Sequence, residues 1–444
     1  MPTNEKWAMY LQALKGPYKK RSKIEFLNPD HSVAFALDNN PVTARNRNFI
    51  QEGSLTVNLQ NGKRRTAKVK LANIDGDYEY NVNKLWFGQQ IRLSMGLELP
   101  NGEDYYLPQG VFYAVNPEEI ISPTQKSVTL NLEDKWTYLD GTLFGRLDGI
   151  YEVPLDTDIF YAIQSVLNFP RENGLKVDDV APIFTSYYNN QTTILPDGTS
   201  VSDLRMPYTY RIEGNDGTYA DIILEMNNIL AGWIGYDATG RLRLDPSQDD
   251  ILDTNKPILW QFTPSEQQFL GATYIVKNKD VFNDIIIVGE ALTEYGYVAG
   301  RASNYDPQSD TNINLIGKKT YMESAAGYAS RRQCEDLAAF KLKRQTILQR
   351  SVTIESAQMF HLQENQLVTI RRLDKPGTPT ERHLINGFTI PIGETGKMTI
   401  QATSVQEFPM ITFTPLPSEE EEPETPPEES TNTEGNNGTV QSNE

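Results

Sequence analysis

The sequence predicts a mainly β protein with an α+β insert, in which two small β-barrel-like domains are joined by an α/β module. This fold class rests on three observations. An alternating hairpin pattern lies near residue 60, and about six short strand patterns separated by turns fill residues 24–140. Helical spacing follows, and strand patterns return after residue 258. The 22 tyrosines and 17 phenylalanines also fit a β-rich chain.

Residues 1–23 are expected to form an N-terminal helix and a basic linker. Residues 4–15 have apolar side chains at helical spacing, and Gly16-Pro17 ends the segment. The basic cluster that follows is interpreted as a solvated linker, with contact to an acidic partner as the alternative. Its members are Lys19, Lys20, Arg21 and Lys23.

The first β-domain is placed at residues 24–140, and its clearest element is a hairpin. Apolar and polar residues alternate over residues 54–59 and again over 67–71, with Asn61-Gly62 between them. An Asn-Gly pair suits a hairpin turn because both residues tolerate positive φ. Further strands are expected at 23–27, 90–97, 105–115 and 127–132.

Residues 141–257 are expected to form the α/β module. Residues 156–169 and 218–230 each carry an apolar face at helical spacing. Behind the second helix, residues 233–236 and 241–244 flank Asp-Ala-Thr-Gly and predict another hairpin.

The second β-domain is placed at residues 258–416. Residues 283–289 form a continuous apolar run that suits a strand buried on both faces, whereas 301–314 suggest an exposed polar loop. The longest expected helix covers residues 324–346. The remaining expected strands are 348–355, 366–372, 384–389, 398–403 and 411–416.

Residues 417–444 predict an acidic, disordered tail. Residues 418–444 hold nine acidic residues and no basic one, which is half of the net charge of −18. With so few apolar residues this segment cannot offset the entropy cost of ordering. The remaining chain is still acidic, which disfavours nonspecific binding to nucleic acid or anionic membranes.

No stretch of the sequence reaches the ~20 apolar residues that a membrane-spanning helix needs. The N-terminus lacks the basic-then-apolar order of a signal peptide. Synthesis in the cytoplasm of the producing cell is therefore expected.

Two acidic groups are candidates for chemical sites. Residues 73–83 hold carboxylates and carboxamides that suggest a cation loop, but they lack the spacing of an EF-hand, so an Asp- and Gly-rich turn is favoured. A second group, Asp245, Asp249, Asp250 and Asp253, could supply paired catalytic carboxylates, but a solvated loop is favoured because sequence adjacency does not form a cleft.

Single residues give no stronger signal for chemistry. Cys334 is the only cysteine and lies on an apolar helix face, so a buried structural thiol is expected. His361 and His383 are assigned no role beyond packing or surface. Phosphate-binding and hydrolase motifs are absent from the sequence. We therefore expect no catalytic, cofactor-binding or metal-binding residue, and an assembly component rather than an enzyme.

Three stretches resemble the tail-hub, or baseplate-hub, proteins of tailed bacteriophages and prophage-derived particles. The first is residues 53–71 followed by Asn73-Ile-Asp-Gly, Lys84-Leu-Trp-Phe-Gly, Leu107-Pro-Gln-Gly-Val-Phe and Leu132-Glu-Asp-Lys. The second is Gly217-Thr-Tyr-Ala-Asp, Ala231-Gly-Trp, Tyr236-Asp and Gly240-Arg-Leu. The third is the helix at 324–346, a strand, and Gln363-Glu-Asn-Gln-Leu-Val-Thr-Ile.

The resemblance implies a virion tail protein that forms a homotrimer with a pseudo-sixfold ring. Such a ring joins the tail tube or distal-tail protein to a spike or fibre, and its lumen lies on the path of the tape-measure protein and DNA, which passes without specific binding. Some hub proteins continue into a lysozyme, peptidase or receptor-binding domain. Here the chain ends in the acidic segment, which leaves wall degradation to another protein.

Two alternatives remain open at the level of sequence. One is a distal-tail or receptor-binding adaptor protein of the tail, and the other is a wall-degrading enzyme. In the hub interpretation, residues 73–83 are better suspected as a ring contact than as a metal site.

Overall fold

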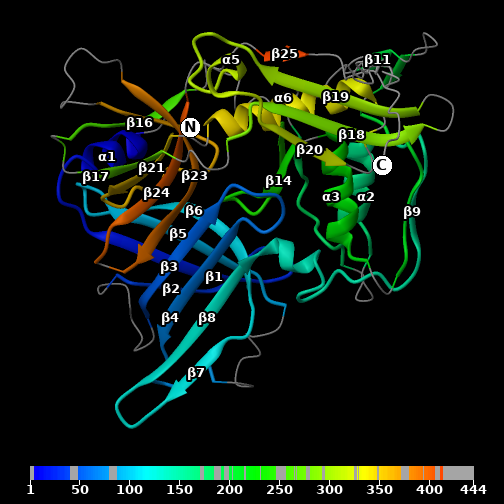
Figure 1. Cartoon of the computed structure of the whole chain (residues 1–444). Helices are drawn as coiled ribbons and strands as arrows, with labels where there is room; N and C mark the ends of the chain where they lie inside the picture. The colour runs from blue at the N-terminus through cyan, green and yellow to red at the C-terminus, as the bar shows by residue number, and fades with distance from the viewer. Residues whose placement is uncertain are drawn as a thin grey trace, which may run out of the picture.

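The computed structural model describes most of the chain (Figure 1). The described residues are 5–40, 49–79, 88–170, 175–184, 192–194, 200–202, 204–214, 217–230, 232–246, 257–264, 266, 268–276, 281–292, 296–324, 328, 330–347, 350–371, 380–393, 395–405 and 411–413. The predicted tail at 417–444 lies outside them.

The described residues of the N-terminal part form one helix and eight strands. They are α1 (Glu5–Ala13), β1 (Lys20–Leu27), β2 (Val33–Asp38), β3 (Ile50–Asn58), β4 (Arg65–Ala72), β5 (Ile91–Glu98), β6 (Asp104–Ala114), β7 (Glu118–Ile121) and β8 (Lys126–Asp134). The predicted hairpin is β3–β4, with Leu55 opposite Ala67. Its connection is a loop of residues 59–64 in which Gly62 adopts a positive φ of 88°.

The basic cluster is not a solvated linker, and this prediction was wrong. Residues 20–23 begin β1, which pairs with both β2 and β5. Arg21 is buried, and its guanidinium bonds to Asp104 at 2.8 Å and to Glu98. Two carboxylates on neighbouring strands thus compensate a cation whose sequence context suggested exposure.

The α/β module follows, as predicted, with its own hydrophobic core. Its elements are the short 3-10 helix η1 (Lys135–Tyr138), β9 (Tyr151–Val153), α2 (Ile159–Leu167), β10 (Ile183–Phe184), β11 (Thr192–Ile194), β12 (Ser200–Ser202), β13 (Tyr210–Ile212), α3 (Tyr219–Leu230), β14 (Gly232–Tyr236) and β15 (Leu242–Pro246). The apolar faces of α2 and α3 pack together with β14 and β15. The hairpin β14–β15 turns through Asp237–Gly240, as the sequence indicated.

The C-terminal strands join the N-terminal ones in a single sheet. Strands β16 (Ile258–Phe262), β17 (Phe269–Val276), β21 (Arg350–Ser356), β22 (Leu367–Ile370), β23 (Glu381–Ile392) and β24 (Met398–Val405) belong to it. The main path runs β17-β21-β24-β23-β3-β4-β8-β6-β5-β1-β2, and the antiparallel pair β23–β3 is the seam between the two β-regions. This path among the described strands is open, so the pairing forms one 14-stranded sheet rather than two closed barrels.

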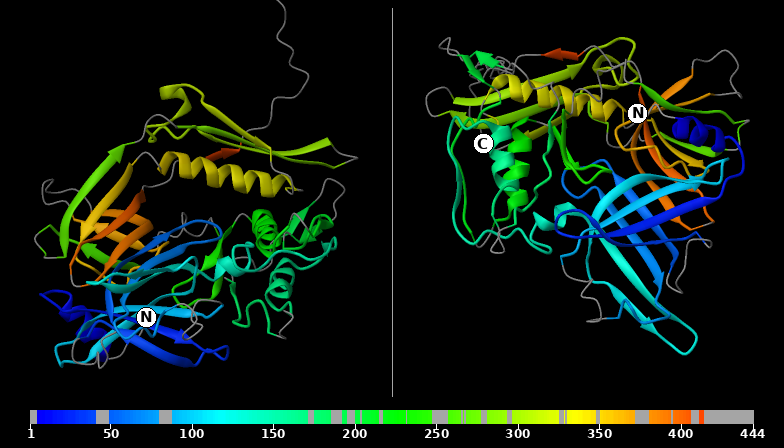
Figure 2. Two further views of the ribbon diagram at one scale, coloured as in Figure 1. Left: turned by 90° about the horizontal axis from the view of Figure 1, so that it is seen from below. Right: turned by 180° about the vertical axis from the view of Figure 1, so that it is seen from behind.

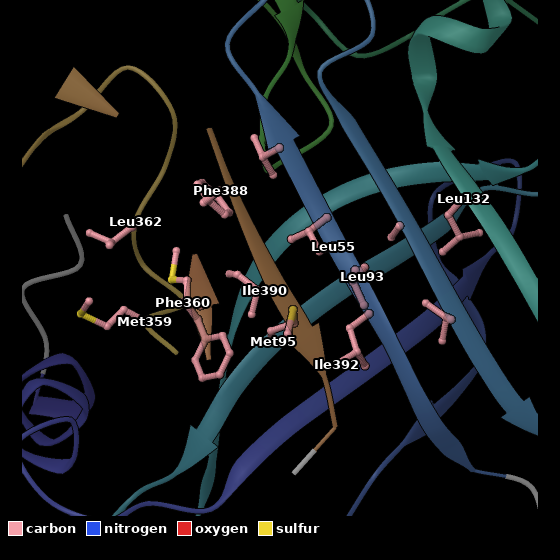
Figure 3. Packing of buried hydrophobic residues seen from close by; sticks show 14 of the residues in the cluster. Leu55, Leu93, Met95, Leu132, Met359, Phe360, Leu362, Phe388, Ile390 and Ile392 are labelled. Carbon is pink, nitrogen blue, oxygen red and sulfur yellow. The ribbon is translucent and has the colours of Figure 1, made fainter. Parts of the chain in front are cut away.

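The hydrophobic core also crosses this seam. Figure 3 shows Leu55 and Leu93 from the N-terminal strands facing Phe388, Ile390 and Ile392 of β23. These residues belong to one buried cluster that includes Met359, Phe360 and Leu362. The two β-regions are therefore fused through backbone pairing and through side-chain packing.

A separate four-stranded sheet carries the longest helix. Its strands are β18 (Asp284–Leu292), β19 (Gly296–Asn304), β20 (Thr320–Ser324) and β25 (Ile411–Phe413), with the short helix α5 (Ile313–Ile316) between β19 and β20. Helix α6 (Arg331–Ile347) packs on the face turned toward the rest of the molecule (Figure 2). Residues 285–287 are buried, as predicted.

The predicted exposed loop at 301–314 is wrong in its first part. Residues 301–304 end β19 and are buried, and Arg301 bonds to Asp284 at 2.9 Å. Helix α6 begins at Arg331, later than the predicted 324, because Ser324 ends β20. None of the helices in the described part of the chain is long and apolar enough to cross a membrane.

Candidate functional site

Among the described residues, several buried charged side chains lie where the hairpin β3–β4, the module and the C-terminal strands meet. Asp134 ends β8 and is fully buried. Its carboxylate accepts hydrogen bonds from the backbone N–H groups of Arg64, Arg65 and Trp136 at 2.8–3.0 Å. Burial nevertheless raises the pKa of Asp134 to about 6, because the three N–H groups only partly replace water. Asp134 thus fixes the hairpin loop to the start of η1.

Lys135 extends this junction into the module. Its ammonium lies 2.6 Å from the carboxylate of Asp178, donates to the Gly240 carbonyl, and stands 5.2 Å from the ring centre of Tyr236. The Tyr236 hydroxyl donates to the other oxygen of Asp178 at 2.8 Å. Burial and this carboxylate raise the pKa of Tyr236 well above its ordinary value. All three charged or polar side chains are buried, so they fix the module against β8.

Arg65 connects the junction to the C-terminal region. Its guanidinium donates to the Gln109 carbonyl, to Gln363 and to the buried carboxylate of Glu364. Removal of one member of such a buried pair leaves an uncompensated charge. Arg65 and Glu364 therefore hold the segment before β22 against β4.

The hairpin loop itself touches the module through its Asn-Gly pair. The Gly62 amide donates to the Ile234 carbonyl at 2.9 Å, and the Asn61 side chain accepts from the Ile234 amide at 2.9 Å. Gly235 allows this approach, since a Cβ there would lie 2.8 Å from the Gly62 carbonyl oxygen. The predicted turn residues thus also serve as a docking point, which periodicity could not indicate.

The geometry of this junction supports a positioning role. Its carboxylates each contact fixed donors, and its cations are each held by carboxylates or carbonyls. Among the described residues, no group of three or more His, Cys, Asp or Glu side chains could hold a metal ion. What the arrangement does is hold three parts of the chain in one orientation.

The acidic loop at 73–83 is described only as far as residue 79. Asn73 is buried and its side chain accepts from the Tyr78 amide at 3.0 Å, while Gly76 adopts a positive φ of 78°. The Asn73 side chain thus closes the loop over residues 73–78. Asn81 and Asn83 lie outside the described residues, so the loop's suspected role as a ring contact remains a proposal.

Only Asp245 of the second acidic group is described. It lies in β15, not in a loop, and is buried with its carboxylate 2.7 Å from Arg243. The expectation of a solvated position was wrong for Asp245, because pairing with an arginine on the same strand compensates its burial. Asp249, Asp250 and Asp253 lie outside the described part of the chain.

Cys334 and His383 are buried, and His361 is partly buried. Cys334 is buried on α6, as expected, and burial raises the pKa of its thiol to about 12. Burial also lowers the pKa values of His361 and His383 to about 4. His361 lies 3.1 Å from the Tyr10 hydroxyl, so it packs α1 against the segment before β22.

Little in the sequence indicates the junction. Asp134 and Lys135 lie in one of the stretches that resemble hub proteins, and Arg65 lies in the predicted hairpin. The one usable signal is the run of three adjacent charged residues, Glu133-Asp134-Lys135, at the end of an apolar strand.

No protein-family model matches the sequence, and no curated protein matches it. Among solved structures, the fold is similar to the tail protein from Neisseria meningitidis MC58, with a TM-score of 0.55 and 8% identity over 87% of this chain and 97% of that one. It is also similar to the 43 kDa tail protein of prophage MuSo2 from Shewanella oneidensis, with a TM-score of 0.53 and 10% identity over 86% and 98% of the two chains. The chain has the fold of these tail proteins, which confirms the sequence resemblance at the level of fold.

Proposed function

We propose that this chain is a structural component of the tail tip of a phage or phage-like particle. The observation that supports this most is the shared fold, which extends over nearly the whole length of both tail proteins and most of this chain. The buried junction is consistent with such a role, because it fixes domains instead of exposing reactive groups. We assign the chain no catalytic role and no cofactor.

Within the tail, the proposed position is a hub ring between the tail tube or distal-tail protein and a spike or fibre. Three copies, each with two β-regions fused at the β3–β23 seam, could offer six roughly equivalent surfaces. A threefold ring could then dock on a sixfold one. The tape-measure protein and DNA would pass through its lumen, and an acidic lumen would oppose adsorption of DNA.

The test is the mass and symmetry of the purified protein, followed by its recovery in tail particles. A hub ring requires a threefold particle with three times the 50.2 kDa mass of the chain. A sixfold particle would favour a distal-tail ring instead. A stable monomer that is absent from tail particles would contradict the tail assignment, and a basic lumen would contradict the proposal for DNA passage.

A further inference from the structure

The ends of four strands meet at one extremity of the molecule. Figure 1 shows the β7–β8 hairpin extending to this end, away from α2, α3 and α6. The Ala72 amide donates to the Phe49 carbonyl at 2.9 Å, and the Asn73 amide donates to the Lys126 carbonyl at 3.0 Å. Lys126 is in turn the β-ladder partner of Ile121. The residue before β3, the residue after β4 and the end of the β7–β8 hairpin therefore lie side by side.

Four large apolar side chains are exposed at this end. Phe49 is 38% exposed, Ile74 45%, Ile120 40% and Ile121 64%. We call these four residues the arm tip. Ile120 and Ile121 are consecutive in β7, so their side chains lie on opposite faces of the projecting hairpin, and each face of its end carries an exposed isoleucine. Scattered single apolar residues need no explanation on a protein surface, but a projecting element that is apolar on both faces of its end marks an interaction site.

The arm tip is held in shape by its own hydrogen bonds. The turn after β7 is closed by the Ser122 amide donating to the Gln125 carbonyl at 2.8 Å, and by the Gln125 amide donating to the Ser122 hydroxyl at 3.0 Å. On the other side, the Asn73 side chain closes the loop that carries Ile74. Such preorganisation reduces the entropy lost on docking.

Carboxylates surround the arm tip. Asp75, Asp77 and Glu118 are exposed, and Lys126 is the exposed cation beside them. Glu119 keeps its Oε1 atom buried without a hydrogen-bond donor. A surface complementary to this one is apolar at its centre and carries Lys or Arg at its rim.

We propose that the arm tip inserts into an apolar pocket with a basic rim on a different protein of the tail. This inference rests on the proposed function. Charge favours a different protein over tip-to-tip contact with a second copy, because that contact would bring Asp75, Asp77 and Glu118 against the same carboxylates of the other copy. The same charge opposes contact with an anionic lipid surface.

The test uses the full chain, produced in place of the wild type in cells that assemble tail particles. A photo-crosslinking amino acid replaces Ile121, and separately Leu155, which is 60% exposed in the module and serves as the matched control. Crosslinks from position 121 to one other tail protein, at a site flanked by Lys or Arg, are expected. The double variant Ile120→Ser with Ile121→Ser should lower incorporation into particles at least tenfold, whereas Leu155→Ser should not.

The outcomes separate this inference from the proposed function. Absence of the wild-type chain from tail particles would contradict the proposed function. If the wild type is incorporated but position 121 crosslinks only to a second copy, or to nothing, the arm-tip inference fails alone. Equal incorporation of the double serine variant and the wild type would also overturn it, provided that both show the same thermal unfolding midpoint.

Discussion

Asp134 is the residue on which the hairpin loop and η1 depend together. Replacing it with Ala leaves three buried backbone N–H groups without their acceptor. At about 1–3 kcal/mol for each unsatisfied group, we expect Asp134→Ala to lower the free energy of unfolding by at least about 3 kcal/mol, measured by urea denaturation at pH 7.5. Asp140→Ala is the control, because Asp140 accepts one exposed amide, and it should cost less than about 1 kcal/mol. Equal losses would contradict this role.

His361 makes stability depend on pH. Burial lowers its folded-state pKa from 6.5 to about 4, so between these values the unfolded chain binds a proton that the folded chain does not. Stability from this group is complete above pH 6.5 and is lost as pH falls toward 4. Asp134 has the opposite effect on the pH dependence of stability. Its folded-state pKa is raised to about 6, so protonation below that pH removes the free-energy penalty of burying its charge.

The contribution of His361 is therefore measured as the difference in free energy of unfolding between the wild type and a variant without the imidazole. The stability advantage of the wild type over His361→Gln should be about 3 kcal/mol larger at pH 7.5 than at pH 4, with urea denaturation at each pH as the measurement. A difference that is the same at both pH values would show that the imidazole is not kept neutral by burial.

At the scale of elements, the contact between the hairpin loop and β14 requires Gly235. A Cβ at this position would lie 2.4 Å from the Arg64 side chain and 2.8 Å from the Gly62 carbonyl oxygen. We expect Gly235→Ala to cost about 1–3 kcal/mol of stability and to speed hydrogen exchange of the Gly62 amide. Gly149→Ala is the control, since a Cβ there meets no atom within 4 Å, and its exchange pattern should match the wild type.

Local elements were predictable from sequence because their information is local. The hairpin β3–β4, helices α2 and α3, and the hairpin β14–β15 each show their periodicity within one window. Strand β7 has four residues, mostly exposed, and no alternation marks it. The first residues of β1 look like a linker until two carboxylates from other strands are placed beside Arg21.

At the scale of the whole molecule, the pairing of distant strands could not be predicted. The seam joins residues more than 300 positions apart, as in the contact between Thr56 and Thr389. Alternation shows that both strands are half-buried but does not select one as the partner of the other. The junction could not be predicted for the same reason. Arg65 and Glu364 are far apart in the sequence and form their ion pair only when the fold brings them together.

The seam makes a prediction about cooperativity. Leu55 of β3 is fully buried in the cluster that spans both β-regions, so Leu55→Ala should cost about 2–5 kcal/mol. Since β3 pairs with β23, the loss should appear as faster hydrogen exchange in β24 and β21 as well as in β4. Faster exchange confined to β1–β8 would mean that the two β-regions unfold independently. Leu155→Ala, at an exposed position of the module, should leave exchange in all these strands unchanged, because that side chain lies outside the shared core.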